Sequence, residues 1–287
     1  MKVQEIIERI KRAPETDIIL LSELEYGKPP RYALFDSDGT ISTLREGWEK
    51  VMAPVMLAMI CGETEPTAEI RQEVAQYIHD STGINTIIQM EHLVEMVEAH
   101  GLVTDDQVLD PAGYKRVYNE RLMVPVGERI GQIIAGNVNP SDFTIAGVLN
   151  FLRALHNQKV EMRVFSGTDE ADVQHELEIL GAAAFFVRIH GALSRYEDSN
   201  KEKILQELMT EGNLSGPEVI VVGDGPVEIR EAKKRGCLAI GVASDEVNRQ
   251  GWNEAKVERL ANAGADILIP DFRCAADLLN LLCLLPV

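Results

Sequence analysis

The chain of 287 residues carries 28 Lys and Arg against 46 Asp and Glu, which gives a formal net charge of −18 at pH 7. This length allows one large domain or a core domain with a smaller second one, and 45% hydrophobic residues are typical of a soluble globular protein. The acidic balance argues against nucleic acid or an anionic membrane as partner, because both require a basic face. An apolar run long enough for a transmembrane helix is absent from the sequence.

The amino-terminal segment MKVQEIIERIKRAPETD has a charged helical pattern and lacks the apolar core of a signal peptide. The four cysteines at positions 61, 237, 274 and 283 form no CxxC pair, so we expect reduced, mostly buried thiols in a cytoplasmic protein. After a predicted turn at GKPP, the apolar run YALF at residues 32–35 predicts a buried strand that ends at Asp36.

From residue 44 to about residue 135, apolar residues follow the helical period and no clear strand alternation occurs. The expected helical segments lie near residues 49–60, 74–78, 87–97 and 121–134. We therefore predict a helical cap domain over residues 44–143, inserted between two parts of a core that residues 1–43 and 144–287 form.

Beyond residue 144 the sequence predicts alternating strands and helices. The expected strands are 160–165, 185–189, 219–222, 238–242 and 267–269, and the expected helices are 148–155, 171–180, 201–209, 227–235 and 275–285. This alternation predicts an α/β fold, a three-layer Rossmann-like core with a parallel sheet covered on both faces. Ligands bind beyond the carboxyl ends of such strands, so the residues that follow each strand are candidate site residues.

Two carboxylates, Asp36 and Asp38, follow the first of these strands and precede a glycine. Burying two anions is unfavourable unless a cation pairs with them, and Mg²⁺ prefers one or two carboxylates plus substrate oxygens. A plain Asp-Gly turn is the alternative interpretation. The second strand leads into Ser166, Gly167 and Thr168, whose hydroxyl and backbone N–H groups suit an oxyanion. The alternative for Ser166 is a plain helix cap.

Further acids and a lysine are expected at the same edge of the sheet. Asp224 follows the strand at 219–222, and Glu228 lies near the first turn of the next helix. Lys201 and its rival Lys203 open another helix in the segment NKEK. The alternatives are a turn-forming role for Asp224, a helix-dipole role for Glu228 and a solvated lysine at 201. Together these residue types suit transfer of a phosphoryl group to an aspartate, because cations and N–H and O–H donors screen its charge.

The segments FDSDGT, FSGT, NKEK and VVGDGPVE follow one another in the order of the motifs of the haloacid dehalogenase-like hydrolase superfamily, which the sequence resembles from about residue 36 to about residue 245. The resemblance implies a cap of the type placed between the first and second motifs. It also implies residue roles: Asp36 as nucleophile, Asp38 as general acid/base, Ser166, Gly167 and Lys201 as phosphate-binding residues, and Asp36, the backbone carbonyl of Asp38, Asp224 and Glu228 as ligands of Mg²⁺. Family members often have aspartate where this chain has Glu228, which leaves direct or water-mediated binding open.

The resemblance implies a Mg²⁺-dependent phosphatase that hydrolyses a small phosphorylated metabolite through a phospho-aspartate at Asp36. A phosphomutase of the same family and a non-catalytic phosphate-binding protein on this fold are the alternatives. A dehalogenase is disfavoured, because it would have no use for Asp38 and the metal-binding acids. A phosphonatase is disfavoured too, because it would need a cap lysine in a recognisable motif.

Residues Arg45, Glu46 and Trp48 enter the predicted cap soon after the nucleophile loop. We expect them to contact the substrate, with a hinge or packing role as the alternative. The polar segment from Ser81 to Asn85 is a second candidate for a loop that reaches the substrate. Closure of the predicted cap would exclude water while Asp36 is phosphorylated.

Overall fold

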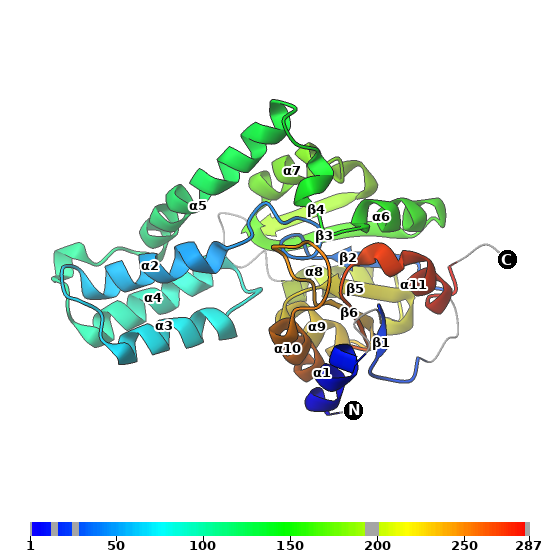
Figure 1. Cartoon of the computed structure of the whole chain (residues 1–287), viewed down its shortest axis with the longest axis horizontal. Coiled ribbons are helices and arrows are strands. Elements are labelled where there is room, and N and C mark those ends of the chain that lie inside the picture. The colour runs from blue at the N-terminus through cyan, green and yellow to red at the C-terminus, as the bar shows by residue number, and fades with distance from the viewer. Residues whose placement is uncertain (1, 13–16, 25–28, 193–200, 285–287) are drawn as a thin grey trace. The chain divides into compact units, whose positions relative to one another are not determined.

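A computed structural model describes residues 2–12, 17–24, 29–192 and 201–284 of the chain (Figure 1). The chain forms two compact units, which we call the core unit (Met1–Glu46 with Gln132–Val287) and the helical unit (Gly47–Gly131). The helical unit is narrower than the interval 44–143, because residues 44–46 and 132–143 group with the core unit. Residues 27, 28 and 200, which belong to the predicted turn and to the NKEK segment, lie outside the described residues.

In the described residues, the core unit contains one seven-stranded sheet in the order β1-β7-β6-β5-β2-β3-β4. The strands are β1 (Ile19–Leu20), β2 (Tyr32–Phe35), β3 (Glu161–Asp169), β4 (Arg188–Ala192), β5 (Val219–Gly223), β6 (Leu238–Val242) and β7 (Ile267–Ile269). Strands β2 to β7 pair in parallel, and β1 alone pairs antiparallel, against β7. The predicted α/β fold with a parallel sheet is therefore confirmed, while the short edge strand β1 was not predicted.

Helices cover both faces of this sheet. The core unit contains α1 (Val3–Arg12), α6 (Val148–Asn157), α7 (Glu170–Ile179), α8 (Lys201–Glu211), α9 (Pro226–Lys234), α10 (Glu254–Ala263) and α11 (Ala275–Leu281). Side chains alternate along β2, so that Ala33 and Phe35 join the apolar cluster under α6, α7 and α11. Leu34 points the other way and joins the cluster under α1, α8, α9 and α10. The core therefore has three layers, as predicted.

The bounds of several elements in the core unit differ from the sequence prediction. Strand β4 begins at Arg188, because residues 183–185 form a 3₁₀ turn from which Phe185 and Phe186 pack against the core. Strand β3 continues to Asp169, so Ser166 lies within a strand and does not cap the next helix. Helix α11 ends at Leu281, four residues before the predicted end.

Helix α10 was not predicted, although its sequence carries a recognisable signal. The side chain of Asn253 caps the helix by accepting a hydrogen bond from the backbone N–H of Lys256 at 3.1 Å. Val257 and Leu260 bury the apolar face against the core. A capping residue followed by apolar residues at helical spacing would have indicated this helix.

The helical unit is built from α2 (Trp48–Cys61), α3 (Ala68–Asp80), α4 (Thr86–His100) and α5 (Pro111–Ile134). These helices correspond to the four predicted segments, and α5 begins ten residues before the predicted start. The side chains of Thr67 and Asn85 cap α3 and α4 by accepting backbone hydrogen bonds. Helix α2 packs on both α3 and α4 and buries Met52, Val55 and Met56.

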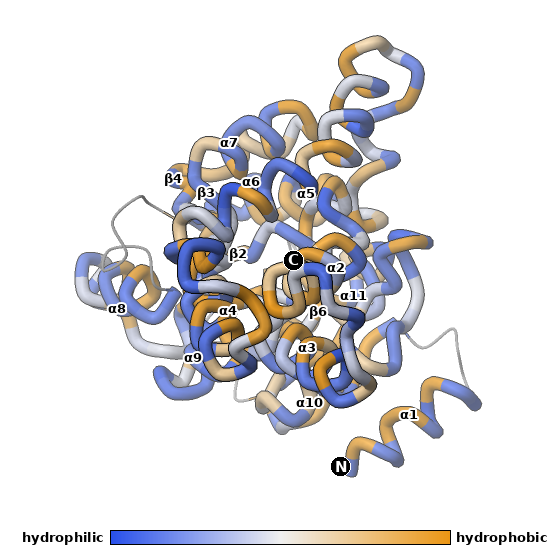
Figure 2. Tube along the Cα trace, turned by 90° about the vertical axis from the view of Figure 1, so that its left-hand side faces the viewer, coloured by the Kyte–Doolittle hydropathy of each residue, from blue (hydrophilic) through white to orange (hydrophobic). Residues whose placement is uncertain are grey.

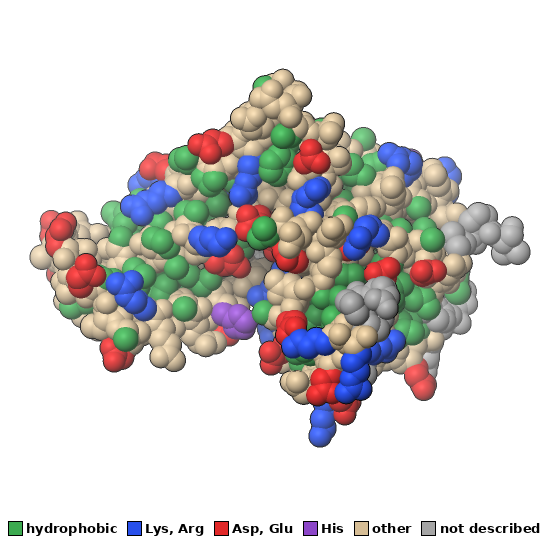
Figure 3. All heavy atoms as spheres, viewed as in Figure 1, with side chains coloured by type: hydrophobic (Ala, Val, Ile, Leu, Met, Phe, Trp, Pro, Cys, Tyr) green, Lys and Arg blue, Asp and Glu red, His purple; other side chains and the backbone are tan. Residues whose placement is uncertain are grey.

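The four cysteines are free, and three of them are buried. No disulfide joins the four cysteines, which all lie in described residues; only Cys283 is exposed. On the face shown in Figure 3, Lys and Arg side chains are interspersed with Asp and Glu side chains. None of the helices in the described ranges is long and apolar enough to cross a membrane.

The amino-terminal helix α1 is part of the core unit. Hydrophobic and hydrophilic residues alternate along it (Figure 2), and the side chains of Ile6 and Ile10 are buried. They join the apolar cluster of α8, α9 and α10, and α1 packs on α10. Helix α1 therefore stabilises the core unit through a hydrophobic contact.

We predict that Ile6→Ala lowers the free energy of unfolding by about 2–5 kcal/mol, because it removes a buried side chain and leaves a cavity. Urea unfolding followed by circular dichroism measures the change. Gln4→Ala, on the exposed side of the same helix, should change the value by less than about 0.5 kcal/mol. Equal stability of the two variants would show that α1 does not pack as described.

Candidate active site

The central strand β2 places Asp36 at the carboxyl edge of the sheet. Strand β2 lies between β3 and β5 in the sheet. The chain continues from β2 to β3 and β4 on one side and then crosses to β5, β6 and β7 on the other side. In open parallel sheets such a reversal of strand order creates a crevice beyond the strand ends. The Asp36 backbone N–H donates to the carbonyl of Val222 at 2.9 Å, and the residue is 5% exposed. The predicted nucleophile therefore lies at the position where a ligand would bind.

A tight loop follows Asp36. The carbonyl of Ser37 accepts hydrogen bonds from the backbone N–H groups of Ile41 and Ser42 at 2.8 and 2.9 Å. Gly39 adopts a φ of 71°, and a Cβ there would collide with the carboxylate of Asp224. Glycine is required on both counts, because only it combines a left-handed backbone with this close approach. The loop thus brings the segment after β2 against the segment after β5.

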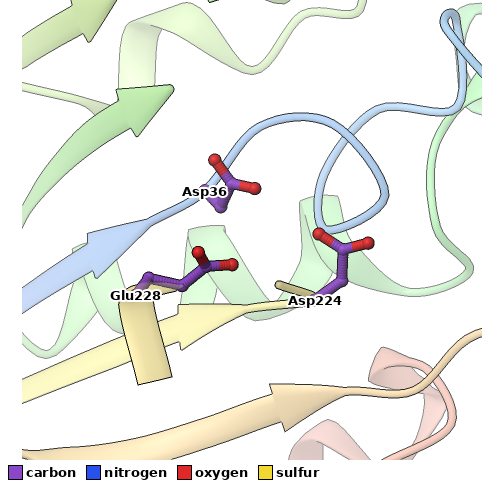
Figure 4. Close-up of side chains that lie close together, drawn as sticks. All are labelled: Asp36, Asp224 and Glu228. Carbon is purple, nitrogen blue, oxygen red and sulfur yellow. The ribbon is translucent and has the colours of Figure 1, made fainter. Parts of the chain in front are cut away.

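Three buried carboxylates meet at this edge. Asp36 follows β2, Asp224 follows β5, and Glu228 lies in the first turn of α9 (Figure 4). One carboxylate oxygen from each lies within 4.8 Å of the others. Such a group of hard oxygen donors suits a divalent cation, and Mg²⁺ typically takes few protein carboxylates and keeps positions for substrate and water.

Lys201 lies between two of these acids. Its Nζ donates to Asp36 Oδ1 and to Glu228 Oε2, each at 3.0 Å, and its side chain is 6% exposed. Burial opposes the charge of this lysine, but the two carboxylates outweigh burial and raise its pKa. The other oxygen of Glu228, Oε1, accepts the backbone N–H of Gly225 at 2.6 Å and so caps α9. Glu228 therefore both stabilises the helix start and faces the site.

Asp224 forms an ion pair with a second buried lysine, Lys256. The Nζ of Lys256, from α10, donates to Asp224 Oδ2 at 2.7 Å and lies 2.6 Å from Glu246 Oε1. Burial disfavours the charged lysine, yet the two carboxylates outweigh burial and raise its pKa. Lys256 was not predicted as a site residue, because the helix that carries it, α10, was not predicted either.

The electrostatics of Asp36 fit a bound cation. Burial raises its pKa well above the ordinary value; Lys201 opposes this rise, and the nearby acids Glu228, Asp224 and Asp38 add to it. The single positive charge of Lys201 faces the carboxylates of both Asp36 and Glu228 and does not balance their two negative charges. A divalent cation among these oxygens would supply the missing positive charge, so the residues present fit the predicted Mg²⁺.

Asp38 lies beside this group and is only partly buried. Its Oδ2 accepts a hydrogen bond from the hydroxyl of Thr168 at 2.8 Å, and its Oδ1 lies 3.9 Å from Nε of Arg45. Its side chain is 29% exposed. A partly exposed carboxyl group that is held through only one of its oxygens is suited to exchanging protons with a ligand.

The remaining predicted phosphate-binding residues lie in the last part of β3. Ser166 is buried, and its hydroxyl accepts the backbone N–H of Thr168 at 3.1 Å. The pairing register of β3 with β4 shifts between Phe165 and Asp169. This irregularity indicates that the segment of Ser166 and Gly167 departs from regular strand pairing.

The structure therefore brings Asp36, Lys201, Asp224 and Glu228 into direct contact or close proximity and leaves Asp38 at their side. Lys203 lies two residues further along α8 and is half-buried, whereas Lys201 contacts both Asp36 and Glu228. Of the predicted substrate contacts, Arg45 binds acids of α7, Glu46 ends the first segment of the core unit, and Trp48 begins α2 in the helical unit. Their contact with substrate stays a prediction.

Solved structures of similar fold include proteins described as predicted phosphatases and as a β-phosphoglucomutase. The chain is similar to a protein described as a predicted phosphoglycolate phosphatase from Haemophilus somnus 129PT (TM-score 0.59, 17% identity, 88% of this chain and 99% of that one). It is similar to a predicted phosphatase from Clostridium acetobutylicum (TM-score 0.59, 18% identity, 88% and 100% coverage). A β-phosphoglucomutase from Clostridium difficile also matches (TM-score 0.54, 14% identity, 84% and 91% coverage). At these identities the likeness establishes the fold.

No curated protein sequence matches the chain. The model of the haloacid dehalogenase-like hydrolase family matches residues 30–236, which include β2 with Asp36, β3 with Ser166, and β5 with Asp224. This match spans most of the chain and agrees with the sheet order and with the acids at the strand ends. The chain belongs to the haloacid dehalogenase-like hydrolase family.

Proposed function

We propose that this hydrolase is a Mg²⁺-dependent phosphatase that acts on a small phosphomonoester through a phospho-aspartate at Asp36. The observation that carries the proposal is the contact of buried Asp36 with Lys201, beside Asp224 and Glu228. The names of the similar phosphatase structures support the same reaction class. A binding protein would have no need for a buried carboxylate nucleophile with a second carboxyl group two residues away.

The first step would transfer the phosphoryl group to the protein. A carboxylate oxygen of Asp36 attacks phosphorus, and the bond from phosphorus to the ester oxygen breaks with its electron pair on that oxygen. Asp38 donates a proton to the departing oxygen, so an alcohol leaves. Lys201, the Ser166 hydroxyl and the Gly167 N–H bind the oxygens of the transferring group.

The second step would release phosphate. Asp38, now a carboxylate, accepts a proton from a water molecule as the water oxygen attacks phosphorus. The bond between phosphorus and Asp36 breaks, inorganic phosphate forms, and both carboxyl groups return to their first state. Asp36, Asp224, Glu228 and the backbone carbonyl of Asp38 would hold Mg²⁺, whose charge reduces the repulsion between Asp36 and the phosphoryl oxygens.

Chain connectivity supports a substrate-selecting role for the helical unit, which we propose to be the cap. Its first residues follow Asp36 by about ten positions, and Arg45, Glu46 and Trp48 form the entry into it. A helical cap over the site would admit a metabolite more readily than the surface of a folded protein. The substrate class proposed is therefore a small phosphorylated metabolite.

A phosphomutase is the second candidate, because β-phosphoglucomutase is among the proteins of similar fold. In that reaction the phospho-aspartate would return its phosphoryl group to a hydroxyl of the substrate instead of to water. Product analysis distinguishes the two functions. Free phosphate indicates the phosphatase, and an isomeric phosphate ester indicates the mutase.

We predict that Asp36→Asn lowers turnover of p-nitrophenyl phosphate by at least about 10³-fold, because the nucleophile is lost. The assay is run with Mg²⁺, together with a panel of phosphorylated metabolites. Circular dichroism checks that the variant is folded, and Asp277→Asn on the exposed face of α11 serves as the matched control with unchanged rate. Equal turnover by wild type and Asp36→Asn would rule out the mechanism.

We predict that Lys201→Met lowers kcat/KM by about 10²–10³-fold, the usual effect of removing one donor to a developing negative charge. Lys203→Met should change kcat/KM by less than about threefold, because the contact with Asp36 belongs to Lys201. Steady-state kinetics on both purified variants measures the difference. The opposite ranking would assign the phosphate-binding role to Lys203.

We predict that EDTA abolishes turnover, that Mg²⁺ restores it, and that Mg²⁺ alone stabilises the metal-free protein. At a free concentration of about 100 times the Kd, binding should add about 2.7 kcal/mol to the free energy of unfolding. Thermal melting measures this gain without any substrate. Asp224→Asn should remove the gain while Asp277→Asn keeps it, and a gain unchanged in Asp224→Asn would exclude Asp224 as a ligand.

A further inference from the structure

A second buried charge cluster lies behind the proposed general acid/base, within the core unit. It consists of Arg45 from the segment after β2 and Asp172 and Glu176 from α7. The side chain of Arg45 is 8% exposed and that of Glu176 is 2% exposed. The mechanism proposed above uses none of these three residues, so the burial of Arg45 and Glu176 calls for a separate explanation.

The guanidinium of Arg45 is fixed by α7. Its Nη2 donates to Glu176 Oε1 at 2.6 Å, and its Nε donates to the same oxygen at 3.0 Å. Nη2 also donates to Asp172 Oδ2 at 3.3 Å. Because Asp172 and Glu176 are four residues apart, they lie on one face of the helix and hold the planar guanidinium together.

The same guanidinium faces Asp38. Its Nε lies 3.9 Å from Asp38 Oδ1, which is too far for a hydrogen bond. This oxygen is buried and has no hydrogen-bond partner among the described residues, whereas Oδ2 is held by Thr168. Asp38 is therefore fixed through one oxygen, and its other oxygen lies next to a positive charge that is bound elsewhere.

The charges around Arg45 agree with this geometry. Burial disfavours its positive charge, but Asp38 and Glu176 outweigh burial and raise its pKa. Burial also raises the pKa of Glu176, to about 7, with Arg45 opposing the rise. A carboxylate buried at this cost is weak evidence of a stabilising role, because apolar residues often stabilise such positions equally well.

We propose that Glu176 is a positioning residue for Asp38 and acts through Arg45. By binding two guanidinium nitrogens, Glu176 keeps Arg45 from forming a charge-assisted hydrogen bond with Asp38 Oδ1, so this buried oxygen keeps no strong partner that would compete with proton transfer by Asp38. The inference rests on the proposed phosphatase function, in which Asp38 transfers the protons. It assigns Arg45 a role beside the nucleophile loop in place of direct substrate contact.

The test uses leaving groups that differ in their need for a proton. The alcohol of an alkyl phosphate requires protonation by Asp38 as it departs, whereas p-nitrophenolate is stable enough to leave without it. We expect Glu176→Gln to lower kcat/KM for an alkyl phosphate by about 10–100-fold, the usual effect of removing a group that orients an active-site residue. For p-nitrophenyl phosphate, kcat/KM should change by less than about threefold. Its kcat and KM should both fall by a similar factor, because the attack of water on the phospho-aspartate still requires Asp38.

A double-mutant comparison adds a second readout. Because Glu176 acts through Asp38, adding Glu176→Gln to Asp38→Asn should cause no further loss with the alkyl phosphate. Glu178→Gln, on the exposed side of α7, is the matched control and should retain wild-type values. If Glu176→Gln fails to fold, Asp172→Asn supplies the same comparison and should show the same substrate pattern with a smaller loss.

Equal losses on both substrates, or a further loss in the double variant, would overturn the positioning role and leave the phosphatase proposal intact. A wild-type protein that hydrolyses neither substrate would overturn the phosphatase proposal, and with it this inference. The two failures are distinguished by the wild-type rate alone.

Discussion

The buried carboxylate of Asp36 is the constraint on which the site depends. At the end of a central strand it has little access to water, and the acids that follow β5 add to the negative potential around it. The contact with Lys201 compensates part of this charge. The negative charge that Lys201 does not compensate favours the binding of a cation. The same cation would be needed before an anionic phosphoester approaches.

The positions of the acids follow from the topology of the sheet, which the sequence predicts well. Apolar runs bounded by glycine or aspartate identify β2, β5, β6 and β7, because fully buried parallel strands carry few polar residues. Since the carboxyl ends of parallel strands share one edge, Asp36 and Asp224 are expected together before any coordinates are known. Adjacent pairing of β2 with β5 explains why their contact is so close.

The rest of the site depends on tertiary contacts that have no local pattern. Lys256 lies on a helix and forms a hydrogen bond with Asp224, which is 32 residues away in the sequence. Arg45 forms a hydrogen bond with Glu176, which is 131 residues away. A lysine or glutamate on an amphipathic helix has the same sequence signature whether it is solvated or buried. Similarly, the apolar residues 185 and 186 resemble a strand, and only packing shows that they belong to a turn before β4.

The charged contacts of the core unit divide the acids of the proposed active site into two separately supported groups. Lys201 and Lys256 hold Asp36, Glu228 and Asp224, which a cation would also bind, whereas Thr168 and Arg45 flank Asp38. Because the ion pairs of the described residues link these two groups to different basic side chains, a change in the supports of Asp38 should leave the lysine contacts of the proposed metal-binding acids in place. A phosphatase needs this separation, since its nucleophile must stay ionised beside a cation while its neighbour gains and loses a proton in every cycle.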